Sequence, residues 1–218
     1  MRPDESIDEV QLRRRLAEMV RASPTLMRVL ETLRALGLPD WRVASGAIFQ
    51  TVWNAVTGRD PDYGIKDYDV LYFDPDTSWE AEDVQIRRAA AAFPPDLAAK
   101  VEVRNQARVH LWFEDHFGEP YEPLSRTDEA LVRFLTPANA VAIRLMADGA
   151  LDLAAPLGLA DCFAMRLRHN PLRPFNPVSY AKVTSDLQRR WPEVVVEPGP
   201  LDLAAQPCDL PEPVSRGA

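Results

Sequence analysis

The stretch from Gly64 to Asp74 constrains the fold more than any other part of this sequence. Apolar and aromatic residues dominate it, which is typical of a buried β-strand. Because strand side chains alternate between faces, Asp67 and Asp69 should point the same way. Two close carboxylates repel each other unless a cation lies between them, and Mg²⁺ prefers oxygen ligands of this kind. The alternative is a strand end on the surface, with both acids in solvent.

A small-residue turn precedes this strand. Residues 41–44 predict a short strand, Ser45-Gly46 a tight turn, and residues 47–56 a helix that ends near Gly58. Such a turn lets backbone N–H groups and the helix dipole approach a phosphate. Tight turns need small residues in any case, so the turn alone does not establish a phosphate site.

Further along the chain, a third acid lies on a predicted strand. Residues 79–92 predict a helix, and residues 100–104 and 107–113 predict two strands. Glu102 points away from the face of its valine neighbours. It could act as a third metal ligand or as a base, or it could face solvent on an edge strand.

Helices and a hairpin flank this central region. Helices are predicted over residues 8–22, 23–37, 127–134, 156–167 and 178–191. A β-hairpin is predicted from residues 140–145 and 150–153. The Pro-rich, acidic sequence beyond residue 192 is typical of disorder. We therefore expect an α+β domain with a small mixed sheet over residues 37–192, N-terminal helices over residues 1–36, and a tail over residues 193–218.

Composition and charge limit the possible functions. The 218 residues carry a net charge of −8, which argues against an extended nucleic-acid surface but not against a local basic patch. No apolar run approaches the roughly 18 residues of a membrane helix. The distant cysteines Cys162 and Cys208 argue against a disulfide framework and favour a cytoplasmic location. The most basic run is either a solvated loop or an anion contact: Arg166, Arg168, His169 and Arg173.

The chain resembles the nucleotidyltransferase fold of the DNA polymerase β superfamily. The resemblance lies in the order of its elements: a strand, a small-residue turn, a helix, a strand with Asp-x-Asp, and a later strand with an acid. The chain is more closely similar to the bacterial nucleotidyltransferase-like family NTP_transf_6, once described as a domain of unknown function. The similar segments cover much of roughly residues 10–192: 36–41, 44–47, 52–54, 65–70, 102–112, 155–161 and 168–171.

The resemblance implies roles for five residues. Ser45 and Gly46 would form the phosphate-binding turn, Asp67 and Asp69 would bind Mg²⁺ or Mn²⁺, and Glu102 would be the third carboxylate. All three acids would be catalytic and metal-binding. Two features depart from the superfamily pattern. The turn is Ser-Gly rather than Gly-Ser, and the spacing from the turn to the acid pair is longer than usual.

The implied activity is metal-dependent transfer of a nucleoside monophosphate from a nucleoside triphosphate to a hydroxyl acceptor. Arg104 and Arg108 are candidate triphosphate contacts, or they pair with surface acids. The acidic balance favours a small molecule or a protein over RNA as the acceptor. The main alternative is a non-catalytic nucleotide-binding or regulatory module on the same fold. A third hypothesis is a partner-binding protein that uses its N-terminal helices or its tail.

Overall fold

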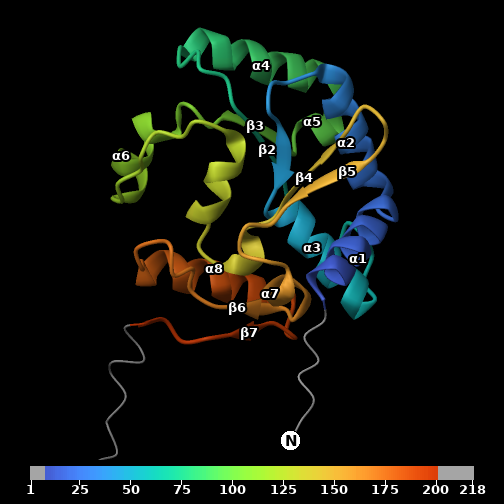
Figure 1. The fold of residues 1–218 in the computed structure, drawn as a ribbon, viewed down its shortest axis with the longest axis vertical. Helices are drawn as coiled ribbons and strands as arrows, with labels where there is room; N and C mark the ends of the chain where they lie inside the picture. Colours follow the sequence, from blue (N-terminus) through green and yellow to red (C-terminus); the bar gives the residue numbers. More distant parts are fainter. Residues whose placement is uncertain (1–7, 201–218) are drawn as a thin grey trace, which may run out of the picture.

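A five-stranded mixed sheet lies at the centre of the computed structural model, which describes residues 8–200 (Figure 1). Its strand order is β3-β2-β1-β4-β5, with β2 and β3 parallel and the other neighbours antiparallel. The strands are β1 (Arg42–Ala44), β2 (Tyr68–Tyr72), β3 (Val101–Asn105), β4 (Ala142–Leu145) and β5 (Leu151–Ala154). A separate parallel pair joins β6 (Arg166–Leu167) to β7 (Val195–Val196).

Helices surround the sheet, and several end at the residues that the sequence predicts. They are α1 (Glu9–Arg21), α2 (Pro24–Leu36), α3 (Gly46–Thr57), α4 (Trp79–Ala92), α5 (Pro95–Ala98), α6 (Phe113–Phe117), α7 (Ala160–Phe163) and α8 (Pro177–Arg190), with the 3₁₀ helices η1 (Val109–Leu111), η2 (Thr127–Arg133) and η3 (Pro137–Asn139). Ser23 caps α2 by accepting from the N–H of Leu26, and Gly37 ends it with a φ of 67°.

The prediction of a strand over residues 107–113 is wrong. This segment forms η1 and the start of α6 instead. The cause is Asn105, whose side-chain Oδ1 accepts hydrogen bonds from the N–H groups of Asp74 and Ala107 and turns the chain away from the sheet. An alternation of apolar and polar residues therefore does not lead to a strand here.

Three further predictions differ from the structure. Residues 127–134 form a 3₁₀ helix rather than an α-helix. The helix predicted over residues 156–167 shortens to α7, because Met165 takes a φ of 51° and its carbonyl accepts from the N–H of Val195. That contact draws the first part of the predicted tail into β7. The part of the predicted tail beyond residue 200, with Cys208, lies outside the described residues.

The two faces of the sheet have different surroundings. The main core packs α1 to α4 against one face, which presents Val43, Val70 and Val103. On the other face, Ala44 and Leu71 belong to a smaller cluster with η2 residues. The acids predicted for the site belong to this second face, because Asp69 and Leu71 are two residues apart in one strand.

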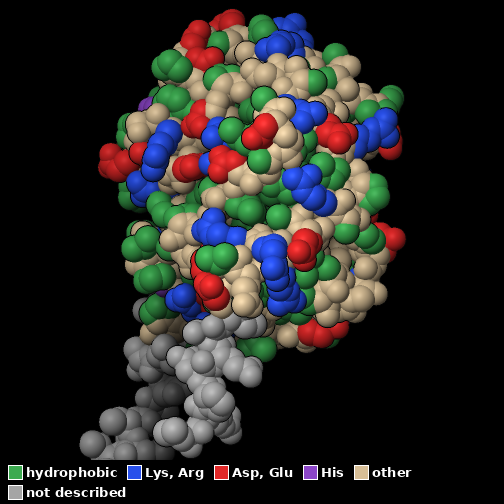
Figure 2. Space-filling model, turned by 45° about the vertical axis from the view of Figure 1, so that its right-hand side comes forward, with side chains coloured by type: hydrophobic (Ala, Val, Ile, Leu, Met, Phe, Trp, Pro, Cys, Tyr) green, Lys and Arg blue, Asp and Glu red, His purple; other side chains and the backbone are tan. Residues whose placement is uncertain are grey.

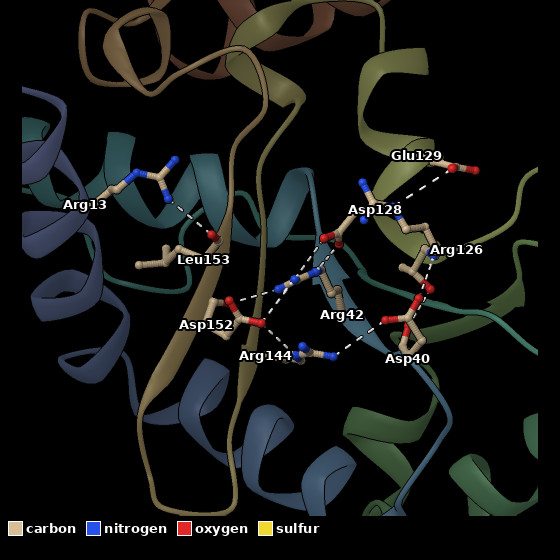
Figure 3. Close-up of polar contacts among 10 residues, drawn as sticks. Arg13, Asp40, Arg42, Arg126, Asp128, Glu129, Arg144, Asp152 and Leu153 are labelled. Atoms are coloured by element: carbon tan, nitrogen blue, oxygen red, sulfur yellow. Dashed lines mark hydrogen bonds and ion pairs between the residues drawn. The ribbon is translucent and has the colours of Figure 1, made fainter.

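A network of charged side chains attaches η2 to the second face (Figure 3). Arg42 on β1 is almost fully buried and pairs with Asp128 of η2 and, at 3.2 Å, with Asp152 of β5. Arg144 on β4 pairs with Asp152 at 2.8 Å and with Asp40 at 3.6 Å. Every acid of this network has a cationic partner, and the buried guanidinium of Arg42 has two carboxylates, as burial of a charge requires.

The loop between α3 and β2 is held by side chains from two helices. Asn54 donates to the carbonyl of Tyr63 at 2.8 Å and accepts from the indole N–H of Trp191 at 2.9 Å. Arg190 donates to the carbonyl of Gly64 at 2.7 Å. Gly64 packs so closely on Trp191 that a Cβ atom would lie 2.5 Å from the ring. The loop therefore enters β2 in a defined position.

We expect Gly64→Ala to lower the free energy of unfolding by about 2–4 kcal/mol. The added Cβ clashes with Trp191, and the φ of 70° disfavours any side chain. The control is Gly58→Ala, which has a similar φ of 68° but nothing within 4 Å of the added atom, and should cost only about 1 kcal/mol. Urea unfolding measures both, and equal losses would contradict the packing argument.

Candidate active site

The Ser45-Gly46 turn directly adjoins the acid pair. Ser45 follows β1 and has a φ of 52°, a conformation that non-glycine residues rarely adopt. Gly46 begins α3, and a Cβ on it would lie 3.3 Å from Nε2 of Gln50 and 3.8 Å from Oδ1 of Asp67. The structure thus brings together a helix N-terminus and an acid that are far apart in sequence.

The acid pair carries negative charge that its surroundings do not balance. Asp67 lies just before β2, and Asp69 lies within it, opposite Ala44 of β1 and in register with Glu102 of β3. Burial raises the pKa of Asp69 to about 7, and the charges of Asp67 and Glu102 add to the effect, while Arg104 opposes it. A cation at this position would relieve both the repulsion and the cost of burial.

Glu102 lies in β3 as predicted, but it does not form a compact metal-binding group with the acid pair. Its carboxylate is exposed and lies 3.7 Å from the guanidinium of Arg104. Within residues 8–200, no three His, Cys, Asp or Glu side chains are close enough together to hold a metal ion. The donor set that fits Mg²⁺ or Mn²⁺ is therefore the oxygen pair of Asp67 and Asp69. Glu102 can join only if its carboxylate leaves Arg104.

A cleft of about 840 Å³ opens beside the turn and the acids. Aromatic side chains from α6 form part of its wall, and α8 contributes another part. Asp186 is the one lining acid outside the predicted pair, and it lies 3.6 Å from Lys66 and 2.7 Å from Arg190. The basic residues that line the cleft are Lys66, Arg173, Lys182, Arg189 and Arg190. This excess of cations in an acidic chain suits an anionic ligand.

The structure places some candidate residues away from the cleft. Arg108, a predicted triphosphate contact, pairs at 2.8 Å with Glu82, whose side chain is 8% exposed, and does not line the cleft. Arg108 lies there because the buried carboxylate of Glu82 needs a cationic partner. In the basic run, Arg166 and Arg168 both pair with the buried Asp161, and Arg173 alone lines the cleft.

Gln50 is a candidate site residue that the sequence interpretation missed. It is only 6% exposed, lines the cleft, and its Oε1 has no hydrogen-bond partner. Its Nε2 faces Gly46. A buried amide oxygen without a partner costs about 1–3 kcal/mol, a cost that a ligand with a hydrogen-bond donor would remove. The available signal was a glutamine near the start of a mostly apolar helix. The sequence predicts α8 as an amphipathic helix but does not indicate that its residues line a cleft.

Comparison with known proteins agrees with this geometry. A model of the NTP_transf_6 family, described as nucleotidyltransferase, matches residues 31–196. The chain belongs to this family. A solved structure described as "The NMR structure of the protein reveals a CCA-adding enzyme head domain" is similar, with 25% identity and a TM-score of 0.66 over 84% of this chain and 94% of the other. A search of curated proteins gave no match.

These findings confirm the predicted family, the α+β nucleotidyltransferase fold and the enzyme class. The chain is a nucleotidyltransferase by family and by fold. Across residues 8–200, the helices are too short or too polar to span a bilayer.

We expect Asp69→Asn to raise the free energy of unfolding of the metal-free chain by about 1 kcal/mol, or roughly 2–4 °C in Tm. The substitution removes a half-buried charge that Asp67 and Glu102 repel. Asp186→Asn is the matched control, because Asp186 pairs with three cations and its loss should lower Tm. Thermal unfolding in a chelator measures both. A lower Tm for Asp69→Asn would contradict the proposed repulsion.

Proposed function

We propose that this chain transfers a nucleoside monophosphate from a nucleoside triphosphate to a hydroxyl acceptor, with a divalent cation held by Asp67 and Asp69. The observation that carries the proposal is the proximity of Gly46 in the α3 turn to Asp67 of the acid pair. A Cβ atom added to Gly46 would lie only 3.8 Å from Oδ1 of Asp67. Phosphate at the turn and metal at the acids would then be neighbours, as nucleotidyl transfer requires.

The phosphates of the nucleotide would bind between the turn and the basic residues of the cleft. The free N–H groups of the first turn of α3 would donate to phosphate oxygens. Lys66, next to Asp67 in the chain, and Lys182 of α8 would supply positive charge. When bound, Mg²⁺ or Mn²⁺ would neutralise charge on the phosphates. These contacts would orient the α-phosphorus toward the acceptor.

In the transfer step, the acceptor oxygen attacks the α-phosphorus and the bond from that phosphorus to the β-phosphate oxygen breaks. Pyrophosphate leaves, and the proton of the hydroxyl passes to a base. We assign this role to Glu102, which is in register with Asp69 and exposed enough to reach an acceptor. The assignment requires that its carboxylate leave Arg104.

The charge distribution favours a small molecule or a protein over RNA as the acceptor. On the face drawn in Figure 2, acidic and basic side chains are interspersed rather than gathered into a basic stripe. With a net charge of −8, the chain lacks the general excess of cations that phosphate backbones attract.

A nucleotide-binding module without turnover is the second candidate function. The observation in its favour is the contact of Glu102 with Arg104, which keeps the third carboxylate out of the acid pair. Both candidates predict nucleotide binding. Only the first predicts release of pyrophosphate.

We expect one or more of the four ribonucleoside triphosphates to raise Tm in the presence of Mg²⁺ or Mn²⁺ but not in a chelator. At about 100 times the dissociation constant, the gain should be roughly 2.7 kcal/mol. Asp67→Asn should abolish it. Asp96→Asn, on α5 and outside the cleft lining, should retain it. No response of the wild type to any nucleotide would overturn the proposal. Binding without pyrophosphate release would favour the second candidate.

We also expect Gln50→Met to separate stability from binding. Removal of the unpaired buried Oε1 should raise Tm of the free chain, whereas loss of the Nε2 donor beside Gly46 should weaken nucleoside triphosphate binding about tenfold. Nucleoside binding should not change if the amide contacts phosphate. Gln85→Met, on α4 and outside the cleft, is the control. Unchanged triphosphate affinity would exclude Gln50 from the site.

A further inference from the structure

A second pocket, of about 210 Å³, adjoins the cleft on the same face of the sheet. Leu71 of β2 and Arg104 of β3 are register partners and both line it. Each lies two residues beyond an acid of the site, Asp69 or Glu102, so the pocket begins about 6–7 Å from the acids along the strands. The residues common to the pocket and the cleft are Phe113, Phe134 and Arg173.

The sheet places the acids between the phosphate turn and this second pocket. The turn follows β1, the acid pair lies at the start of β2, and the pocket lies further along β2 toward β3. In nucleotidyl transfer the attacking and leaving oxygens lie roughly in line on opposite sides of the phosphorus. If pyrophosphate leaves at the turn, as the proposed function holds, the acceptor approaches from the pocket.

Among the described residues, three arginines and no acid line the pocket. Arg173 is already paired with Glu119 at 2.7 Å. Within residues 8–200, no hydrogen bond or ion pair is found for the side chain of Arg133, and its Nε is buried without a partner. Arg104 has only the 3.7 Å contact with Glu102 and a 3.2 Å hydrogen bond to the carbonyl of Val103. Arg104 and Arg133 therefore retain donors for an oxyanion.

The remaining lining of the pocket is mostly apolar and aromatic. Tyr121 lies under the guanidinium of Arg133, with its ring centroid 5.4 Å from Cζ. The other aromatic residues are Trp112, Phe113 and Phe134. Walls of this kind bind a planar apolar body by stacking or edge contacts.

We propose that this pocket binds the acceptor, and that the acceptor is a small hydroxyl compound with a planar apolar body and an anionic group. The carboxylate or phosphate of the acceptor binds Arg104 and Arg133, and its hydroxyl reaches the acid pair through the shared boundary with the cleft. The proposal rests on the proposed function for the acceptor role.

The test follows the indole N–H of Trp112 in the NMR spectrum of the ¹⁵N-labelled full chain. Phenyl phosphate, benzoate and benzyl alcohol are the probes, with no metal added. One or both anions should shift the signal saturably, with an affinity at least about tenfold above that of benzyl alcohol. The anion that binds more tightly identifies the group as phosphate or carboxylate.

Variants assign the binding to the arginines. Arg133→Met should weaken anion binding about tenfold, and Arg133→Lys should restore part of it. Arg126→Met is the matched control, because Arg126 immediately precedes η2, is 69% exposed and pairs with Glu129 outside the pocket. Tm of each variant, measured in parallel, shows that each is folded. Loss of binding in the Arg126 variant as well would overturn the assignment.

Nucleotide titrations separate this inference from the proposed function. Arg133→Met should retain the metal-dependent rise in Tm with nucleoside triphosphate. An equal loss of nucleotide and anion binding would assign the pocket to the nucleotide and overturn the acceptor role. A wild type that binds nucleotide but neither anion, or that binds benzyl alcohol equally well, would overturn the acceptor proposal alone. Anion binding without any nucleotide response would overturn the proposed function and the acceptor role with it.

Discussion

The pairing of β1 with β2 is the constraint on which the site depends. Its register sets Ala44 opposite Asp69, so the turn that follows β1 lies against the residue that precedes β2. A slip of one residue would carry Asp67 and Asp69 to the face of Val70, inside the main core, where two charges cannot be accommodated. The apolar core therefore enforces the register, and the register assembles the site.

Charged side chains on the second face of the sheet are paired in one region and unbalanced in another. Around Arg42 the acids are all paired, and this network holds η2 over part of the face. At Asp69, the charges of Asp67 and Glu102 raise the pKa of the carboxyl, and Arg104 only partly offsets them. The paired region contributes to stability, whereas the unpaired region costs stability, which agrees with the cation site proposed for it.

The cleft is composed of segments from both halves of the chain. The turn and acids come from the first third, and the basic wall comes from α8 near the end of the described chain. Trp191, directly after α8, also packs on Gly64 in the loop before the acids. The same C-terminal segment thus positions the acids and supplies the cations that face them. Three residues shared with the second pocket place the proposed nucleotide and acceptor side by side.

Much of the local structure follows from the sequence alone. Caps and helical periodicity predict the limits of α2, α3 and α4, and Asp-Gly predicts the hairpin of β4 and β5. These features depend on contacts within a few residues of each other, so a local pattern contains the necessary information. The placement of Asp67 and Asp69 on the same side of the chain also depends only on their spacing of two residues.

Other features were decided only by the tertiary structure. Arg108 pairs with Glu82 and Glu102 lies against Arg104, yet sequence pattern alone left each of these residues with more than one role. Gln50 became a cleft residue, and residues 107–113 left the sheet, because of neighbours that are distant in the chain or a side chain that turns the backbone. A charge or an amide takes the partner that packing brings to it, and packing is long-range. The sequence by itself therefore determined which chemical groups are present, and the fold decided which of them meet.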